Sequence, residues 1–211
     1  ILLYILVNRL WQASARSEKQ LRFVLEGSEL GFWDWDIAAN KVERNSRWAQ
    51  MLGYTHGEIQ NTTKQWTDFI HPDDRERAWN SINDVIEGRT TFHRLEYRML
   101  HKNGSTRWIL DQASVMQRDK SGKPLRMCGT HTDITALRQA AEILRESESR
   151  FHSLYNNMAE GVAQHRLVFD AAGQVVDYVI LNVNPAFETH TGLRSEDVMG
   201  KSATEAYGSV P

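Results

Sequence analysis

The segment 31–37, "GFWDWDI", concentrates two tryptophans, a phenylalanine and two carboxylates in seven residues. Asp34 and Asp36 are two positions apart, so a β-strand would present both carboxylates on one face. Such a pair could hold a cation or pair with an arginine, although solvation at the surface is the commoner outcome. Trp33 and Trp35 would lie on the opposite face, where they could line a ligand pocket or fill a core. Core packing is the favoured interpretation, because seven tryptophans are spread along the chain.

The other residue types that commonly do chemistry are scattered. Cys128 is the only cysteine, which excludes an internal disulfide and a multi-cysteine metal site and is typical of a reducing cytoplasmic setting. His93, His101 and His131 fall on separate predicted strands, and His71 precedes a predicted helix. No nucleophile elbow is present. We therefore expect neither a catalytic site nor a metal site in these residues.

Composition indicates a folded protein without a nucleic-acid footprint. The chain has 211 residues, of which 41% are hydrophobic, enough for one large or two small domains. It carries 25 basic and 27 acidic residues, for a net charge of −2. Nucleic-acid binding normally needs a basic surface, so no nucleic-acid partner is expected.

The first residues resemble the end of a membrane helix. The run 1–7, "ILLYILV", is apolar but shorter than the ~20 residues that span a bilayer. Basic residues follow at Arg9, Arg16, Lys19 and Arg22, as expected on a cytoplasmic flank. We interpret 1–16 as the inner end of a membrane helix or as part of a signalling helix. The alternative is an amphipathic or coiled-coil helix.

An internal repeat organises the chain. Residues 17–31 align without a gap to 147–161, and 45–60 align to 184–199. The identities are Ser17 with Ser147, Glu18 with Glu148, Gly31 with Gly161, Asn45 with Asn184 and Gly53 with Gly192. The offset grows between the two alignments, so the second copy contains extra residues, which we assign to a longer first hairpin. One copy is a small domain, and about half of the second copy is present.

Periodicity predicts an α+β domain over 17–133. Helices are expected at 17–27, 46–52, 57–60, 64–70 and 72–87, and strands at 32–37, 41–44, 91–100, 106–117 and 125–132. Asn45 or Ser46 would cap the second helix. Asn103-Gly104 is a strong hairpin signal between the third and fourth strands.

A linker helix, 134–150, follows at "DIT" (133–135), with Asp133 at the expected cap position. Residues 151–211 would form the first half of a second domain. Heptad positions a and d of the linker and the residues after it are occupied by Ile134, Leu137, Ala141, Leu144, Phe151 and Tyr155. A helix that joins two domains, with coiled-coil character, is therefore predicted.

Together these segments resemble the PAS family of sensory domains, in the subgroup with "GxWDWD" at the first strand and "DIT" at the end. The resemblance covers 21–135 through "GFWDWDI", "NSRWAQMLGYTHGEI", "HPDD", "FHRLEYRMLHKNGSTRWI" and "DKSGKPLRMCGTHTDIT". "NVNPAFETHTGL" (182–193) resembles another PAS type. The family implies a five-stranded antiparallel sheet with helices over one face.

The resemblance also implies a function. PAS domains bind a small ligand or cofactor, or pair with a partner, and pass the change through a terminal helix to an output domain. In bacterial receptors anchored in the inner membrane, that output is most often a histidine kinase. A cyclic-di-GMP synthase or phosphodiesterase is the alternative. A ligand-free dimerisation module is a further alternative.

The cofactor stays open. The photoactive flavin subgroup has its cysteine in an "NCRFLQ"-like helix, whereas this chain reads "TTKQWTDFI", so covalent flavin photochemistry is not expected. Haem is not expected, because the long helix 72–87 contains no histidine. Non-covalent flavin or another small molecule remains open. The expected pocket residues are Trp33, Trp35, Met51, Trp66, the pair Phe69 and Ile70, Tyr97 and Trp108.

Signal transmission is assigned to residues near the exit helix: Glu96, Arg98, Arg107, Asp133, Ile134 and Thr135. Glu96 and Arg98 share a strand face and could bond to each other. The resemblance implies that Asp133 ties the exit helix to the sheet, with Arg98 or Arg107 as partner. A shift of the flanking helices in a parallel homodimer would then transmit the signal.

Overall fold

The computed structural model describes residues 27–208, and the chain divides into two compact units at Gln139–Ala140. The predicted membrane helix end at 1–16 and most of the helix at 17–27 lie outside the described residues. Each unit is described by itself.

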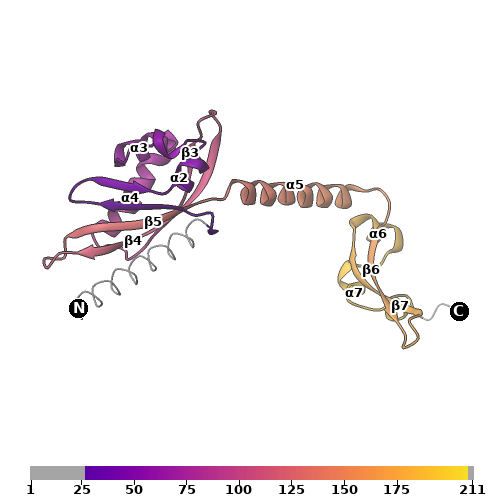
Figure 1. The fold of residues 1–211 in the computed structure, drawn as a ribbon. Coiled ribbons are helices and arrows are strands. Elements are labelled where there is room, and N and C mark those ends of the chain that lie inside the picture. Colours follow the sequence, from indigo (N-terminus) through magenta and orange to yellow (C-terminus); the bar gives the residue numbers. More distant parts are fainter. Residues whose placement is uncertain (1–26, 209–211) are drawn as a thin grey trace. The chain divides into compact units, whose positions relative to one another are not determined.

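The first unit contains a five-stranded antiparallel sheet with helices on one face (Figure 1). Its elements are β1 (Gly31–Asp36), β2 (Lys41–Arg44), α2 (Ser46–Met51), η1 (His56–Glu58), α3 (Thr63–Phe69), η2 (Pro72–Asp74), α4 (Arg75–Ile86), β3 (His93–Leu100), β4 (Thr106–Arg118) and β5 (Pro124–Asp133). The spatial order is β2-β1-β5-β4-β3. The predicted fold class and order of elements are confirmed.

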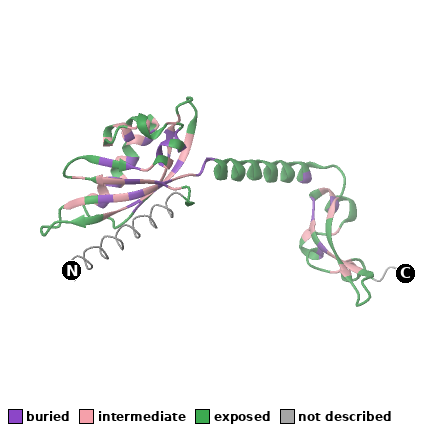
Figure 2. Ribbon diagram, viewed as in Figure 1, coloured by how far each residue is buried: buried purple, intermediate pink, exposed green. Residues whose placement is uncertain are grey.

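The core lies between the sheet and helices α2, α3 and α4, as the buried positions in Figure 2 show. Alternation places one face of each strand inward. Trp33 and Val42 enter the core from β1 and β2, and Tyr97, Ile109 and Met127 enter it from the other strands. This packing fixes the strand register on which the candidate site depends.

One side chain joins β1 to the start of α2. Asn45 caps α2 by accepting a hydrogen bond from the Trp48 amide at 3.0 Å, and the same Oδ1 accepts one from the Phe32 amide at 3.0 Å. Its Nδ2 donates to the Leu30 carbonyl at 3.0 Å. The polar groups of a helix start are thereby satisfied within the protein. The predicted cap is confirmed.

The second unit repeats this arrangement. It contains β6 (Ala163–Phe169), β7 (Val175–Val183), α6 (Pro185–Thr191), α7 (Ser195–Val198) and α8 (Ala203–Tyr207). Asn184 caps α6: its Oδ1 accepts from the Phe187 and Val162 amides at 2.9 and 2.8 Å. The β6–β7 hairpin is longer than β1–β2, as the repeat predicts.

The exit helix differs from its prediction. Helix α5 spans Thr135–Asn157 and so continues beyond residue 150, where the predicted linker ends. Asp133 is still the last residue of β5. It nevertheless accepts a hydrogen bond from the Thr135 amide at 2.9 Å, so it does help to start the helix. Within residues 27–208, none of the helices has the length and apolar character that crossing a membrane requires.

Candidate ligand pocket and helix junction

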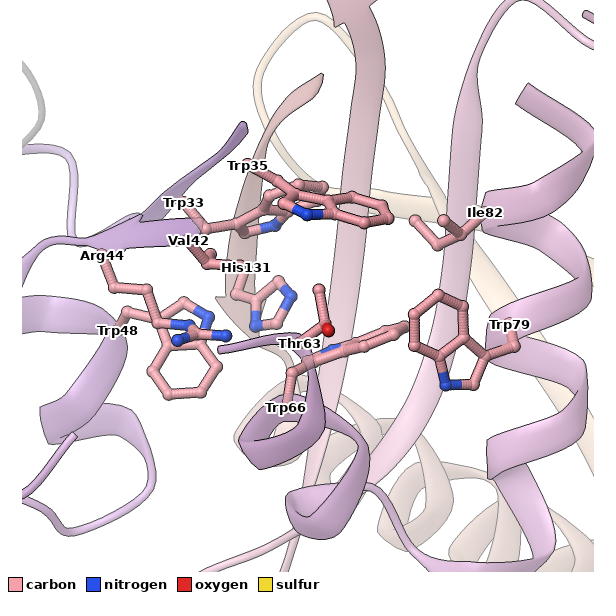
Figure 3. A pocket seen from close by; sticks show the side chains of 10 residues that line it. All are labelled: Trp33, Trp35, Val42, Arg44, Trp48, Thr63, Trp66, Trp79, Ile82 and His131. Carbon is pink, nitrogen blue, oxygen red and sulfur yellow. The ribbon is translucent and has the colours of Figure 1, made fainter. Parts of the chain in front are cut away.

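A pocket opens between β1, β2 and the helices of the first unit (Figure 3). It is lined by Trp33, Trp35, Val42, Arg44, Trp48, Thr63, Trp66, Trp79, Ile82 and His131. The empty volume is about 360 Å³, which includes open solvent at the mouth. The enclosed part has room for only about two water molecules. The walls are mostly indole rings, so the pocket favours a flat, apolar ligand.

The indole rings meet edge to face. The Trp66 and Trp79 rings are 5.0 Å apart at 73°, and those of Trp35 and Trp79 are 6.3 Å apart at 79°. Edge-to-face contacts of this kind stabilise an aromatic cluster beyond its buried area. The rings come from β1, α3 and α4, so the pocket depends on the helices keeping their place over the sheet.

Arg44 is the one arginine of the pocket wall, and its side chain is buried. It is 7% exposed, and its guanidinium donates to the Gln60 and Thr62 carbonyls at 2.9 and 3.0 Å. The guanidinium carbon lies 4.5 Å from the centre of the Trp48 ring, a cation–π distance. No described carboxylate is within ion-pairing distance. Burial lowers the pKa of Arg44 to about 10, so the group stays charged at neutral pH.

A hydrogen-bonded network lies beneath the pocket floor and centres on Asp111, which is 1% exposed. Trp33 Nε1 donates to its Oδ1 at 3.1 Å, and the Tyr97 hydroxyl donates to its Oδ2 at 2.9 Å. His131 Nε2 is 3.1 Å from Oδ2 and His93 Nε2 is 3.4 Å away. The network thus joins β1, β3, β4 and β5.

The electrostatics of Asp111 are set by its partners. Burial alone raises the pKa of this carboxyl, but the charge and hydrogen bonds of His131 and His93 outweigh it, and the net pKa lies well below the usual range. Burial and the Asp111 charge raise the pKa of Tyr97 well above its usual value, so its hydroxyl remains a donor. In residues 27–208 no group of three or more His, Cys, Asp or Glu side chains is arranged to hold a metal ion.

The same strands hold the first turn of α5. Trp108 on β4 accepts a hydrogen bond from the Ile134 amide at 2.9 Å, and its own amide donates to Thr135 Oγ1 at 2.9 Å. Ile134 and Thr135 are both 8% exposed. The helix start is therefore fixed to β4 by two hydrogen bonds, in addition to its covalent link to β5.

A second tie comes from β3. Arg138, one turn into α5, donates from Nε to Glu96 Oε2 at 3.0 Å, and its Nη2 contacts the same oxygen. The Arg138 guanidinium carbon stacks over the Trp108 ring, 4.0 Å from its centre. Because the arginine is pinned between a carboxylate and an indole, a rotation of α5 would break both contacts.

Sequence comparisons agree with this architecture. The family model described as PAS fold matches residues 41–131, and the one described as PAS domain matches residues 149–209. Together the two matches cover well over half of the chain. The chain belongs to the PAS family.

The relatives of this tandem PAS chain are sensory proteins. It is 24% identical over 194 residues to the probable diguanylate cyclase DgcE of Escherichia coli, covering 92% of this chain and 16% of that protein. It is 27% identical over 148 residues to the blue-light-activated histidine kinase of Brucella anthropi, covering 68% of this chain and 28% of that protein. The chain thus spans a small part of each relative.

One solved structure supports the fold. The sensory box histidine kinase/response regulator from Burkholderia thailandensis E264 aligns with a TM-score of 0.54 and 27% identity. The alignment covers 64% of this chain and 99% of that one. This tandem PAS chain is therefore similar to regions of sensory signalling proteins with different outputs.

The predicted pocket residues are divided by the structure. Trp33, Trp35 and Trp66 line the pocket. Met51, Ile70 and Tyr97 are buried in the core but are not part of its lining, and Phe69 packs on Tyr54, which corrects their predicted place. Trp108 is also wrong as a pocket residue, because it lies at the α5 junction. Sequence reasoning missed the wall residues Val42, Arg44, Trp48, Thr63, Trp79, Ile82 and His131.

Some of the predicted transmission residues lie at the junction between the sheet and α5, and others do not. Glu96, Asp133, Ile134 and Thr135 gather at the junction. The predicted Glu96–Arg98 bond is wrong, because Arg98 bonds Asp74 through Nε at 2.9 Å. That hydrogen bond is the main reason why the pKa of Asp74 falls to about 2.

The expected arginine partners of Asp133 are also wrong. Arg98 is engaged by Asp74, and Arg107 Nε is buried without a hydrogen-bond partner. The arginine that ties the exit helix to the sheet is Arg138, which the sequence reasoning did not select. In the sequence, the signal for this role was the position of Arg138 one turn into the predicted helix. Its partner Glu96 is an exposed carboxylate on a strand.

Two chemical alternatives raised by the sequence have structural answers. Asp34 pairs with Arg126 on the adjacent strand, which is one of the alternatives that the sequence left open, whereas solvation was the favoured one. Burial and the Asp34 carboxylate raise the pKa of the Cys128 thiol to about 11. The thiol is therefore protonated at neutral pH, which makes it a poor nucleophile.

Proposed function

We propose that this chain is the tandem PAS sensor region of a bacterial receptor that is anchored in the inner membrane and faces the cytoplasm. In this proposal the first PAS domain receives the signal in the indole-walled pocket. Helix α5 relays it to the second PAS domain and from there to an output domain. The named relatives favour a histidine kinase or a diguanylate cyclase as output.

The observation that carries the relay is the course of three strands. Tyr97, Asp111 and His131 belong to the network under the pocket and lie on β3, β4 and β5, respectively. One to three residues along the same strands, Glu96, Trp108 and Asp133 hold the first turn of α5. A ligand that moves His131 would therefore act on the helix start through a few rigid backbone units.

The homodimer proposal rests on the exposed face of α5. Leu137, Leu144 and Phe151, at heptad positions d, are 70%, 60% and 60% exposed. An apolar stripe of this kind favours pairing with a second copy in a coiled coil. The L144E variant is expected to be monomeric in sedimentation equilibrium. Ile143 is equally exposed but lies off the stripe, so I143E is the matched control.

The relay is tested by cutting one tie without disturbing the pocket. In the full-length receptor, T135V removes the acceptor of the Trp108 amide while the shape of the side chain is kept. We expect the variant to fold and to lose much of its response to stimulus, because one of the two hydrogen bonds that hold the helix start to β4 is lost. T132V is the matched control, since Thr132 lies on β5 three residues before Thr135 and its hydroxyl makes no hydrogen bond. An unchanged response of T135V would refute the relay.

A ligand-free dimerisation module is the second candidate. It is favoured by the small enclosed volume, which holds only about two waters. It predicts that T135V still responds if the stimulus enters elsewhere and that no small molecule shifts the melting temperature. Adding riboflavin phosphate to the purified chain tests the flavin alternative directly, through retention of flavin absorbance after desalting. The output is assigned by incubating the full-length receptor with ATP or GTP and assaying phosphohistidine and cyclic di-GMP.

A further inference from the structure

Three hydrogen-bond donors of the pocket wall lack a partner. Trp35 Nε1, Trp48 Nε1 and Arg44 Nε are buried without a hydrogen-bond partner. The remaining indoles of the wall are engaged: Trp33 donates to Asp111, Trp66 to Tyr97 and Trp79 to Thr67. A buried donor without a partner costs about 1–3 kcal/mol. A ligand that brings oxygen acceptors into the pocket would remove that cost.

Arg44 adds a charge to this set of donors. Its guanidinium is bonded to two neutral carbonyls and lies over an indole, and no described carboxylate compensates its charge. A buried charge without a counter-ion is strongly unfavourable unless a partner compensates it. Asp111, the nearest buried carboxylate of the network, is already bonded by Trp33 and Tyr97. The missing counter-ion must therefore come from outside the described side chains.

The shape of the wall restricts the rest of the ligand. Figure 3 shows Arg44 and Trp48 at one side of the pocket and the rings of Trp66 and Trp79 at the other. The polar end of a ligand would therefore lie near Arg44, and its body would lie among indole rings. Because the enclosed part is small, the body must be thin, and its entry must displace a ring.

We infer that the pocket binds a small planar aromatic carboxylate, whose carboxylate accepts hydrogen bonds from Arg44 Nε and an indole N–H and whose ring lies against Trp66 and Trp79. This inference rests on the proposed function for the idea that the pocket is the sensory input. It adds the chemical class of the ligand and assigns Arg44 as the residue that selects it. A cation is excluded by Arg44, and an inorganic anion would leave the indole walls without a partner.

The test uses three probes of one shape and different charge. Benzoate, benzamide and benzamidine are titrated into the purified 211-residue chain, followed by tryptophan fluorescence and by the melting temperature. Indole-3-carboxylate serves as a second carboxylate with a larger ring. We expect at least one carboxylate to bind at millimolar concentration or below, at least tenfold more tightly than benzamide, with no binding of benzamidine.

Variants then assign the selectivity to Arg44. R44M keeps an unbranched apolar side chain and removes its charge, so the preference for carboxylate over amide should disappear. R47M is the matched control, because Arg47 pairs with Glu29 at the surface and is not part of the wall. Its carboxylate affinity should equal that of the native chain. If R44M fails to fold, the comparison of benzoate with its neutral and cationic analogues on the native chain still decides.

Two results would overturn the inference: neither carboxylate binds, or benzamide or benzamidine binds as tightly as benzoate. Retention of the carboxylate preference in a folded R44M would remove Arg44 from the assignment. These outcomes are distinct from failure of the relay. The relay is tested by the output of T135V and does not depend on which ligand enters the pocket.

Discussion

Asn45 and Asn184 occupy equivalent positions in the two PAS copies, yet the side chains around these two asparagines differ. Each side chain accepts hydrogen bonds from two backbone N–H groups, one in or next to the first strand and one in the following helix. Around Asn184, however, the positions that correspond to Trp33 and Arg44 by the repeat are Ala163 and Val183. The second copy therefore repeats the backbone frame but not the indole wall or the buried cation.

This difference separates two roles of the sequence. The asparagine joins the first strand to the following helix. This backbone arrangement must form before the domain can contain a pocket. The side chains that face inward from that frame are free to differ, because they are not needed to satisfy the backbone. Ligand chemistry is therefore expected in the first copy, and the second copy is the natural internal control.

The largest expected effect is at Asp111, the buried carboxylate at the centre of the network in the first unit. D111A leaves Trp33 Nε1 and the Tyr97 hydroxyl without their acceptor, at about 1–3 kcal/mol for each group, so a loss of about 4 kcal/mol is expected. All seven tryptophans precede Ala140, so urea unfolding followed by tryptophan fluorescence reports on the first unit. A loss below about 1 kcal/mol would contradict this role.

The same residue makes the first unit sensitive to acid. The pKa of Asp111 is lowered in the folded state, so its contribution is complete above the unfolded value of about 3.9. That contribution declines as the pH falls below this value, because the unfolded chain then binds the proton more readily. The midpoint of unfolding should therefore fall in acid, and D111N should reduce this pH dependence.

The next largest loss of stability is expected at Asn45 and Asn184, and each substitution should affect only its own unit. N45A and N184A each leave backbone N–H groups without an acceptor and remove a helix cap, for an expected loss of about 2–3 kcal/mol in one unit. In N45A, hydrogen exchange should accelerate at the Phe32 and Trp48 amides. In N184A it should accelerate at Val162 and Phe187. Faster exchange in both units from one substitution would show that the copies are not independent.

The smallest effect is expected at the paired glycines. A Cβ on Gly161 would meet Phe187 Cα at 2.9 Å, whereas a Cβ on Gly31 would meet Met51 Cε at 2.2 Å and Trp48 Cα at 3.0 Å. The Met51 side chain can move but backbone cannot, so G161A should cost at least as much as G31A, each about 1–2 kcal/mol. G57A is the control, since a Cβ there meets nothing within 4 Å. Free energies of unfolding from amide exchange would test this order, and equal costs at all three positions would contradict it.

Local signals in the sequence were sufficient to predict most helices and strands of the first unit. The bounds of β2 match the sequence prediction, and Asn45 caps its helix as expected. These features depend on residues near one another in the chain, such as a cap and a turn. The Asp34–Arg126 pair was not predicted, because arginine was only one possible partner and solvation was favoured.

The pocket and its network required the register of distant strands. Trp33 and Asp111 are hydrogen-bonded across 78 positions in the chain, and His93 and His131 reach the same carboxylate from two further strands. Sequence spacing placed the histidines on separate strands and so suggested that they were unrelated. Arg44 was missed for a similar reason: its place looks like the end of an edge strand until α3 and α2 cover it.

The position of β5 in the sheet has a consequence for how the domain folds during its synthesis. This strand is the middle one of five in space but the last to be synthesised, and Trp33 finds its register partner in Gly129 only when the ribosome has passed that point. Until then β1 has an unpaired edge, and its residues Trp33 and Trp35 are exposed to the cell. The sheet is therefore completed at the same stage of synthesis at which the start of α5 appears. A nascent chain thus acquires the PAS sensor and its exit helix together.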